Sequence, residues 1–229
     1  MKIDNFDIEK DGVFIIAEIG NNHNGSYKRA IKLIDLAKDA GANCVKFQIR
    51  HLDDLYRESS LKLKGDDLGT EYVLDLLKRF ELSLDEHIKI REYCSRKGIS
   101  YMCTPWDKKS LLFLENLDVP SYKIASADLT NIPLIKEACE TNKPLILSTG
   151  MSTQDEVRET INFLNSCSAD FALLHCNSTY PAPLMDINLN WMKDLKKMHN
   201  LIGYSGHERG IGVSIGAVAM GALIIERHF

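Results

Sequence analysis

Two histidines near the end of the chain have the side-chain type and the placement of metal ligands. His207 follows the apolar run at 201–205, and His228 lies in the next apolar run, 222–229. If these runs are neighbouring parallel strands, their backbones lie ~4.8 Å apart, so that two imidazoles can reach one cation at ~2.1 Å. The sequence therefore predicts a shared divalent metal ion. Separate hydrogen bonds at the rim of the sheet are the alternative for each histidine.

Two lysines interrupt or follow apolar runs. Lys46 lies in the segment CVKFQ, and Lys123 lies in YKIAS. An ammonium group at such a position is partly desolvated and can bind a phosphate or a carboxylate as a point charge. A buried lysine with a lowered pKa is also the nucleophile of Schiff-base aldolases. The sequence leaves both roles open for Lys46 and Lys123.

The elements that position these residues alternate between short apolar runs and amphipathic stretches. Eight candidate strands lie at 14–20, 43–48, 99–104, 121–126, 144–149, 171–176, 201–205 and 222–229. Candidate helices lie at 26–40, 84–97, 108–117, 131–142, 153–165, 188–199 and 211–220, and a longer connection with a helical piece occupies 50–82. Eight apolar strands separated by helices predict a (β/α)8 TIM barrel. An open doubly wound sheet is disfavoured because no GxGxxG follows the first strand.

A single domain is predicted over residues 1–229, because no low-complexity segment, proline-rich linker or long charge run marks a second one. The eighth candidate strand runs to the last residue. We therefore expect a barrel truncated at its eighth strand, with an apolar flank exposed where an eighth helix would pack.

Composition argues against several kinds of partner. The formal net charge is -4, and no run of Lys and Arg interleaves with aromatic residues, which disfavours nucleic acid. No segment approaches the ~20 apolar residues of a membrane span, and the first residues lack the apolar stretch of a signal peptide. The expectation is a cytoplasmic protein without a membrane partner. The six cysteines form no CxxC pair and are expected to be reduced thiols.

Polar residues stand at the carboxyl end of every candidate strand. In a TIM barrel these ends converge on the active site. A single serine or threonine at a strand end needs no functional explanation, because strand ends meet solvent. Lysines, carboxylates, histidines and hydroxyls together, however, suit an anionic substrate, a metal and proton transfer. The set is Glu18, Lys46, Gln48, Thr104, Lys123, Ser126, Asp128, Ser148, Thr149, Asn177, Ser178, Tyr180, Ser205, His207, Glu226 and His228.

Four other histidines are expected to have structural roles. His51, His87 and His199 fall in predicted loops or helices, and His175 lies nearer the core side of its strand. A hydrogen bond within the fold explains each of them without a ligand.

Seven segments in collinear order carry a family resemblance. They are AEIGNNHNG, VKFQ, KIASADLTNIPLI, ILSTGMST, HCNSTYPAP, IGYSGHERGIGVSIGAVAMGA and IIERHF. The chain resembles the sialic acid synthases, including their legionaminate, pseudaminate and spore-coat branches. The resemblance implies a TIM barrel that condenses phosphoenolpyruvate with the open-chain aldehyde of an N-acetylmannosamine-like amino sugar. The products would be phosphate and a nine-carbon 2-keto acid.

The resemblance also implies roles for individual residues. His207 and His228 match metal ligands, commonly for manganese, with magnesium or cobalt as other candidates. Gln48 and Tyr180 match sugar contacts, and Glu18, Lys123 and Asp128 are the catalytic candidates. The positions that match contacts to phosphoenolpyruvate are Lys46, Thr104, Lys123, Ser126, Ser148, Ser178 and Ser205, where Ser178 replaces the Asn of some members.

Two departures from the family pattern bear on function. Asp128 stands where well-known members have Glu, which favours a different sugar. The family also continues into a further helix and an antifreeze-like C-terminal domain, which in the homodimer contributes an arginine to the partner's sugar site. This domain is absent from the sequence. Two alternatives therefore remain: a Schiff-base aldolase on the same barrel, and a non-catalytic truncated barrel that binds a metal or a sugar phosphate.

Overall fold

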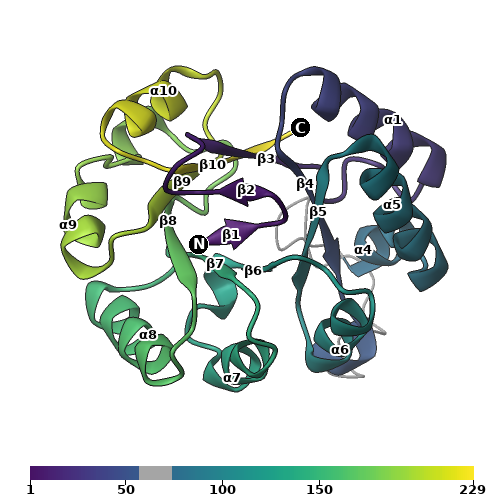
Figure 1. Cartoon of the computed structure of the whole chain (residues 1–229), viewed down its shortest axis with the longest axis horizontal. Helices are drawn as coiled ribbons and strands as arrows, with labels where there is room; N and C mark the ends of the chain where they lie inside the picture. The colour runs from purple at the N-terminus through teal and green to yellow at the C-terminus, as the bar shows by residue number, and fades with distance from the viewer. Residues whose placement is uncertain (57–73) are drawn as a thin grey trace.

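The computed structural model describes residues 1–56 and 74–229 and confirms the predicted (β/α)8 barrel (Figure 1). All strand pairs in the barrel are parallel, and the last strand pairs with the first and closes it. The eight strands begin and end within two residues of the predicted ranges. They are β3 (Phe14–Glu18), β4 (Cys44–Ile49), β5 (Ser100–Pro105), β6 (Tyr122–Ile124), β7 (Leu145–Ser148), β8 (Phe171–Cys176), β9 (Ile202–Gly206) and β10 (Ile224–His228).

The helices cover the outside of the barrel and also follow the predicted ranges. They are α1 (Tyr27–Asp39), α5 (Leu84–Lys97), α6 (Lys108–Asn116), α7 (Ile132–Glu140), α8 (Gln154–Ser166), α9 (Trp191–Met198) and α10 (Gly212–Ala219). In the 50–82 connection the described helices are α2 (Leu52–Leu55) and α4 (Leu74–Phe80), and its middle lies outside the described residues. Capping boxes at Ser83 and Thr153 fix where α5 and α8 begin.

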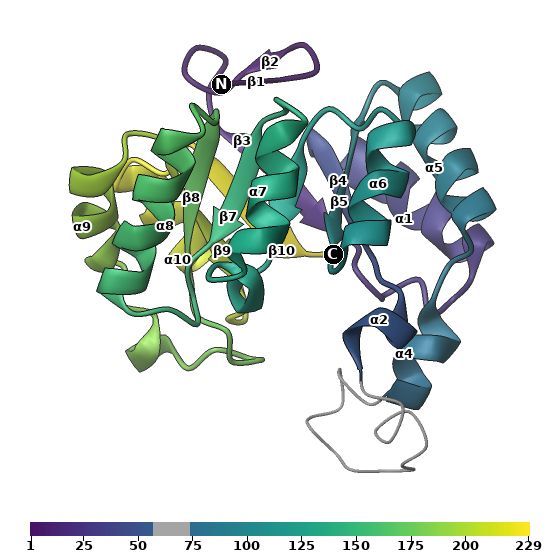
Figure 2. The same ribbon diagram turned by 90° about the horizontal axis from the view of Figure 1, so that it is seen from below.

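An N-terminal hairpin was not predicted from the sequence. It consists of β1 (Lys2–Ile3) and β2 (Phe6–Asp7), which pair antiparallel. Ile3 and Ile8 are fully buried against the apolar side chains inside the barrel. Figure 2 places the hairpin at one end of the barrel and α2 and α4 at the other. The hairpin therefore closes the amino end of the barrel and leaves the carboxyl end for a site.

Apolar side chains are exposed near β10 and β3, where the sequence predicts an apolar flank. On the outward face of these strands Ile15 is 36% exposed, whereas Ala17 and Ile225 are buried, and on α10 Ile215 and Val218 are 61% and 38% exposed. Separately, none of the helices in residues 1–56 and 74–229 has the length and apolar character needed to cross a membrane.

Candidate active site

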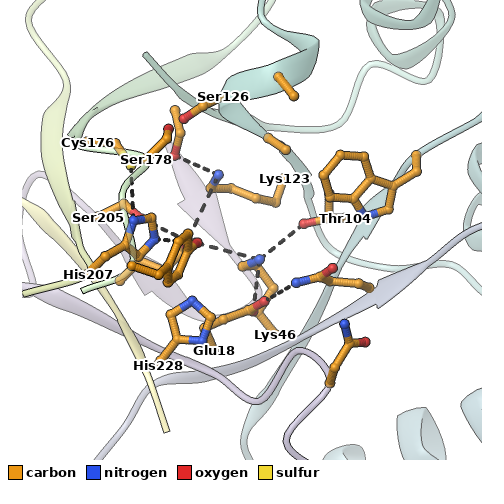
Figure 3. Close-up of a pocket in the computed structure, with 18 of the residues that line it drawn as sticks. Glu18, Lys46, Thr104, Lys123, Ser126, Cys176, Ser178, Ser205, His207 and His228 are labelled. Carbon is orange, nitrogen blue, oxygen red and sulfur yellow. Dashed lines mark hydrogen bonds and ion pairs between the residues drawn. The ribbon is translucent and has the colours of Figure 1, made fainter. Parts of the chain in front are cut away.

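A cavity of about 550 Å³ opens at the carboxyl ends of the barrel strands (Figure 3). Its wall contains the predicted strand-end residues except Asp128, Thr149 and Asn177. Those in the wall are Glu18, Lys46, Gln48, Thr104, Lys123, Ser126, Ser148, Ser178, Tyr180, Ser205, His207, Glu226 and His228. The structure thus brings together side chains from all eight strands or from the loops that directly follow them. Convergence of the strand ends explains the assembly.

Asp128 is not among the residues that line this cavity. Strand β6 ends at Ile124, and the chain then turns into a short 3-10 helix, η1 (Ser126–Asp128). One carboxylate oxygen of Asp128 accepts a hydrogen bond from Asn131, the N-cap of α7, at 3.0 Å. Burial raises the pKa of Asp128, and the bond from Asn131 opposes this. The turn therefore directs the carboxylate to the start of α7.

Lys46 lies in a buried network with Glu18. Its Nζ is 2.8 Å from Glu18 Oε2 and donates to Thr104 Oγ1 at 3.1 Å. Gln48 Nε2 donates to the other oxygen of Glu18 at 2.8 Å. Burial alone would lower the pKa of Lys46, but the nearby carboxylates of Glu18 and Glu226 outweigh it and raise the pKa. Lys46 is therefore a cation at neutral pH.

Lys123 lies across the cavity floor from Lys46. Its Nζ donates to Ser148 Oγ at 2.7 Å and to the backbone carbonyl of Ile124 at 3.1 Å. Burial lowers the pKa of Lys123, and repulsion from Lys46 acts in the same direction while Glu226 opposes them. The two lysines thus differ: Lys46 is held charged, and Lys123 is shifted towards the neutral amine.

Glu226 connects the two lysines, and its position between them was not predicted. It lies 4.0 Å from Lys46 Nζ through one oxygen and 4.0 Å from Lys123 Nζ through the other. Ser205 Oγ donates to it at 3.0 Å. Burial would raise the pKa of Glu226, but the lysines outweigh burial and lower it. The sequence signal was the two-residue alternation in β10, which points Ile224, Glu226 and His228 to the same side.

The two predicted metal ligands lie side by side. The ring centroids of His207 and His228 are 5.4 Å apart. His207 Nδ1 lies 2.6 Å from the backbone carbonyl of Asn177; because a carbonyl only accepts, this nitrogen carries the proton and Nε2 keeps its lone pair. Burial lowers the pKa of His207 to about 4, so the ring is neutral at neutral pH. Nε2 lies 2.7 Å from the Tyr180 hydroxyl, a contact that a metal ion at Nε2 would replace.

These features fit a divalent metal ion with protein ligands from two strand ends. A histidine that ligates a metal is usually neutral, and its other ring nitrogen donates a hydrogen bond to a group such as a backbone carbonyl. Within residues 1–56 and 74–229 no group of three or more His, Cys, Asp or Glu side chains could hold a metal. A metal ion at the two histidines would therefore complete its coordination with water or substrate oxygens.

Several lining residues were missed by the sequence analysis. Arg50 continues the alternation of Lys46 and Gln48 along β4 and contacts Gln48, and its guanidinium lies 4.9 Å from the centre of the Trp106 ring. The asparagines of the GNNHNG loop also line the cavity, whereas Ser26 is the residue that caps α1. The other lining residues outside the predicted set are Phe80, Ala125, Ala127, Met151 and Cys176.

The four histidines expected to have structural roles make hydrogen bonds within the fold. His87 bonds the Tyr101 hydroxyl at 2.9 Å, and His199 bonds a backbone carbonyl at 2.7 Å. His51 lies 3.2 Å from Asp107, the N-cap of α6. His175 Nε2 bonds the carbonyl of Ile187 at 2.5 Å, but its buried Nδ1 has no hydrogen-bond partner in the described part of the chain.

The fold and the position of the cavity place the chain among the (β/α)8 barrels whose site lies at the carboxyl ends of the strands. The family model of the NeuB family matches residues 33–229, so the chain belongs to the NeuB family.

Named relatives and solved structures agree with this assignment. The chain is 39% identical to an N,N'-diacetyllegionaminic acid synthase of Campylobacter jejuni, covering 94% of this chain and 66% of that protein. It is 34% identical to the N-acetylneuraminate-9-phosphate synthase of Homo sapiens, covering 94% of this chain and 61% of that protein. It therefore spans about three fifths to two thirds of the length of these relatives. The crystal structure of a sialic acid synthetase from Leptospira borgpetersenii in complex with citrate has a TM-score of 0.87 at 35% identity, covering 96% of this chain and 73% of that one.

Proposed function

We propose that this barrel carries out the condensation step of a sialic-acid-type synthase. It would join phosphoenolpyruvate to the aldehyde of an N-acetylmannosamine-like amino sugar and form a nine-carbon 2-keto acid and phosphate. The observation that carries the proposal is the pair of buried lysines, Lys46 and Lys123, each hydrogen-bonded to a hydroxyl inside one cavity. The relatives are named as synthases of sialic and legionaminic acids, and these names support the same class of product.

The lysines and hydroxyls suit a compact anion with a phosphate and a carboxylate. Lys46 presents its charge beside Thr104, and Lys123 presents its amine beside Ser148. Glu18 and Glu226 balance these charges when no anion is present. An arriving anion would strengthen the charged form of Lys123, because charge-assisted hydrogen bonds stabilise the ammonium group. Ser126, Ser178 and Ser205 add further hydroxyls to the wall.

The bonding changes balance with the groups present. The enol carbon of phosphoenolpyruvate forms a bond to the aldehyde carbon, whose oxygen takes up a proton. Water adds to the adjacent carbon and gives a tetrahedral centre that carries a hydroxyl and the phosphate. This hydroxyl loses its proton and becomes the keto oxygen as phosphate leaves with the electrons of the carbon–oxygen bond. Of the two protons of water, one balances the proton taken up by the aldehyde oxygen and the other leaves with phosphate. Lys46 and Lys123 would stabilise the departing phosphate by fixed charge. Glu18 would accept the proton of the attacking water, since its carboxylate lies in the wall and Asp128 does not.

His207 and His228 would hold the divalent metal, manganese or alternatively magnesium or cobalt. When bound, this ion supplies Lewis-acid polarisation of the aldehyde oxygen. The Asn177 carbonyl keeps the His207 ring in the tautomer that the ion needs. A homodimer and a cytoplasmic location, which the family resemblance and the composition imply, remain predictions.

The test is product formation with defined substrates. The protein is incubated with phosphoenolpyruvate, Mn2+ and either N-acetylmannosamine or a diacetamido-dideoxyhexose, and phosphate and 2-keto acid are measured together. A longer protein that also contains the family's C-terminal domain is assayed beside it. Equal amounts of phosphate and keto acid from either protein support the proposal. A longer protein that binds Mn2+ yet forms neither product would favour the non-catalytic barrel.

A Schiff-base aldolase is the second candidate, because burial lowers the pKa of Lys123. A neutral amine is the form that attacks a ketone. Borohydride reduction in the presence of pyruvate distinguishes the two functions. A covalent adduct on Lys123 that is absent in Lys123→Met would favour the aldolase, whereas an unmodified protein supports the condensation with phosphoenolpyruvate.

A further inference from the structure

A buried ion pair lies directly behind the two histidines of the candidate metal site. Glu208 follows His207 in the chain, Arg227 precedes His228, and the two side chains contact each other as an ion pair. The Glu208 side chain is fully buried, and the Tyr204 hydroxyl donates to its Oε2 at 2.6 Å. A buried carboxylate is costly unless it is paired and hydrogen-bonded. Both conditions are met here, so the pair is a fixed part of the fold.

Arg227 also holds the backbone that follows His207. Its Nη2 donates to the carbonyl of Glu208 and to that of Gly210, the latter at 3.0 Å. One guanidinium therefore ties the turn at 208–210 to strand β10, which carries His228. The guanidinium spreads five donors over three nitrogens in a fixed plane, whereas a lysine has three donors on a single nitrogen.

Gly206, the residue before His207, lies close to the same ion pair. A Cβ at Gly206 would lie 2.5 Å from Arg227 Nη1 and 2.8 Å from Glu208 Oε2. Only glycine allows the strand to approach this closely. The ion pair thus packs tightly against the backbone before His207 and bonds the backbone after it.

Other contacts of His207 go to the segment that follows β8, including the Tyr180 hydroxyl, 2.7 Å from its Nε2. Its ring bonds the carbonyl of Asn177, and its carbonyl accepts from the amide of Ala182 at 3.2 Å. Both partners belong to the segment that follows β8. These contacts orient the ring, and Tyr180, which stacks on His207, also lies against His228 with ring centroids 5.3 Å apart. The ion pair of Glu208 and Arg227 adds a side-chain tie between the two backbones that carry these histidines, beside the last residue pair of β9 and β10, Gly206 and Arg227.

We propose that Glu208 and Arg227 are positioning residues that set the separation of His207 and His228, and hence the affinity of this site for a divalent metal ion. The inference rests on the proposed function for the metal site itself. A purely structural ion pair would change the stability of the barrel without a specific change in metal affinity, so the two roles predict different measurements.

The experiment is a calorimetric titration with Mn2+ alone, carried out on the wild type and on Glu208→Gln, Arg227→Met and Arg227→Lys. Circular dichroism and thermal unfolding confirm that each variant is folded at the titration temperature. We expect each to bind Mn2+ about tenfold more weakly, as for other groups that orient metal ligands. Arg227→Lys should not rescue the affinity, because its ammonium cannot hold Glu208 and the 208–210 carbonyls together.

Two controls separate positioning from stability. Asp35 accepts from Tyr93 at 2.8 Å and pairs with Lys97 at 2.7 Å, which repeats the tyrosine-plus-cation arrangement outside the cavity. Asp35→Asn should leave Mn2+ affinity unchanged. Tyr204→Phe removes one hydrogen bond from Glu208 but keeps the contacts of Arg227, so it should lower the melting temperature and change Mn2+ affinity less than twofold.

The outcomes also separate this inference from the metal site. If His207→Ala binds Mn2+ as tightly as the wild type, the metal site and this inference both fail. If His207→Ala loses Mn2+ while Glu208→Gln, Arg227→Met and Arg227→Lys bind like the wild type, the metal site stands and the positioning role is overturned. If one variant does not fold, the remaining two decide.

Discussion

The side chains that point into the barrel change from apolar to charged between one inward-facing residue of a strand and the next. On β3, Ile16 lies in the apolar layer near the N-terminal hairpin, and Glu18, the next inward residue, pairs with Lys46. On β10, Ile224 and Glu226 repeat this change. The apolar layer gains free energy from burial, whereas the charged layer must offset the desolvation of four ionisable groups. Stability and chemistry are thus separated along the same strands.

The largest expected effect breaks the apolar layer. Ile16 is fully buried, and Ile16→Ala should lower the free energy of unfolding by roughly 2–5 kcal/mol through lost burial and a cavity. Phosphoenolpyruvate affinity, measured by calorimetry below the unfolding transition, should stay within about twofold, because the lysines sit one layer away. A large loss of affinity with a small loss of stability would contradict the separation of the two layers.

The second prediction removes one ionisable group from the charged layer. Lys123→Met should weaken phosphoenolpyruvate binding by about 1.5–3 kcal/mol, the range for a hydrogen bond to a charged group. Thermal stability should change little, because Met fills a similar space and Glu226 still faces Lys46 at 4.0 Å. Fluorescence-monitored unfolding and calorimetry on the same preparation give both numbers. Unchanged affinity would show that Lys123 does not contact the anion.

A pH titration tests a third buried layer, outside the barrel wall. Burial lowers the pKa of His87, which packs against Phe47 and Tyr101, from the usual 6.5 to about 4. A histidine with a depressed folded-state pKa stabilises the fold fully above pH 6.5. That contribution is lost as pH falls from 6.5 towards 4, by roughly 1.4 kcal/mol per pKa unit. The free energy of unfolding, measured with denaturant at pH 5 and pH 7, should change less with pH in His87→Gln than in the wild type. An equal change in both proteins would mean that His87 does not cause the loss of stability at low pH.

The sequence was sufficient for the barrel because each strand is buried on both faces and reads as a continuous apolar run. Convergence of the strand ends then placed most of the pocket. The N-terminal hairpin was missed because strands of two residues carry no periodicity. The bridging position of Glu226 depends on two lysines from separate strands meeting in space, which spacing along the chain does not encode. Asp128 was misplaced because the turn after Ile124 is a local backbone choice.

We expect the smallest effect from a substitution of Asp128. The measurement tests whether Asp in place of the family's Glu determines which sugar is used. The shorter carboxylate suggested from the sequence a preference for a modified hexose that Asp128→Glu would reverse. In the structure this carboxylate bonds Asn131 at the start of α7 and is not part of the cavity wall.

A residue that does not line the cavity changes the choice of sugar only through the backbone that it supports. In Asp128→Glu the added methylene needs space beside α7 and not in the cavity. We therefore expect the ratio of kcat/KM for a diacetamido-dideoxyhexose to that for N-acetylmannosamine to stay within about twofold in Asp128→Glu of an active, longer protein. The melting temperature should fall slightly because the bond to Asn131 is strained. A tenfold change in this ratio would mean that Asp128 turns into the cavity when the sugar binds. The residues of η1 would then belong to the charged layer that forms the site.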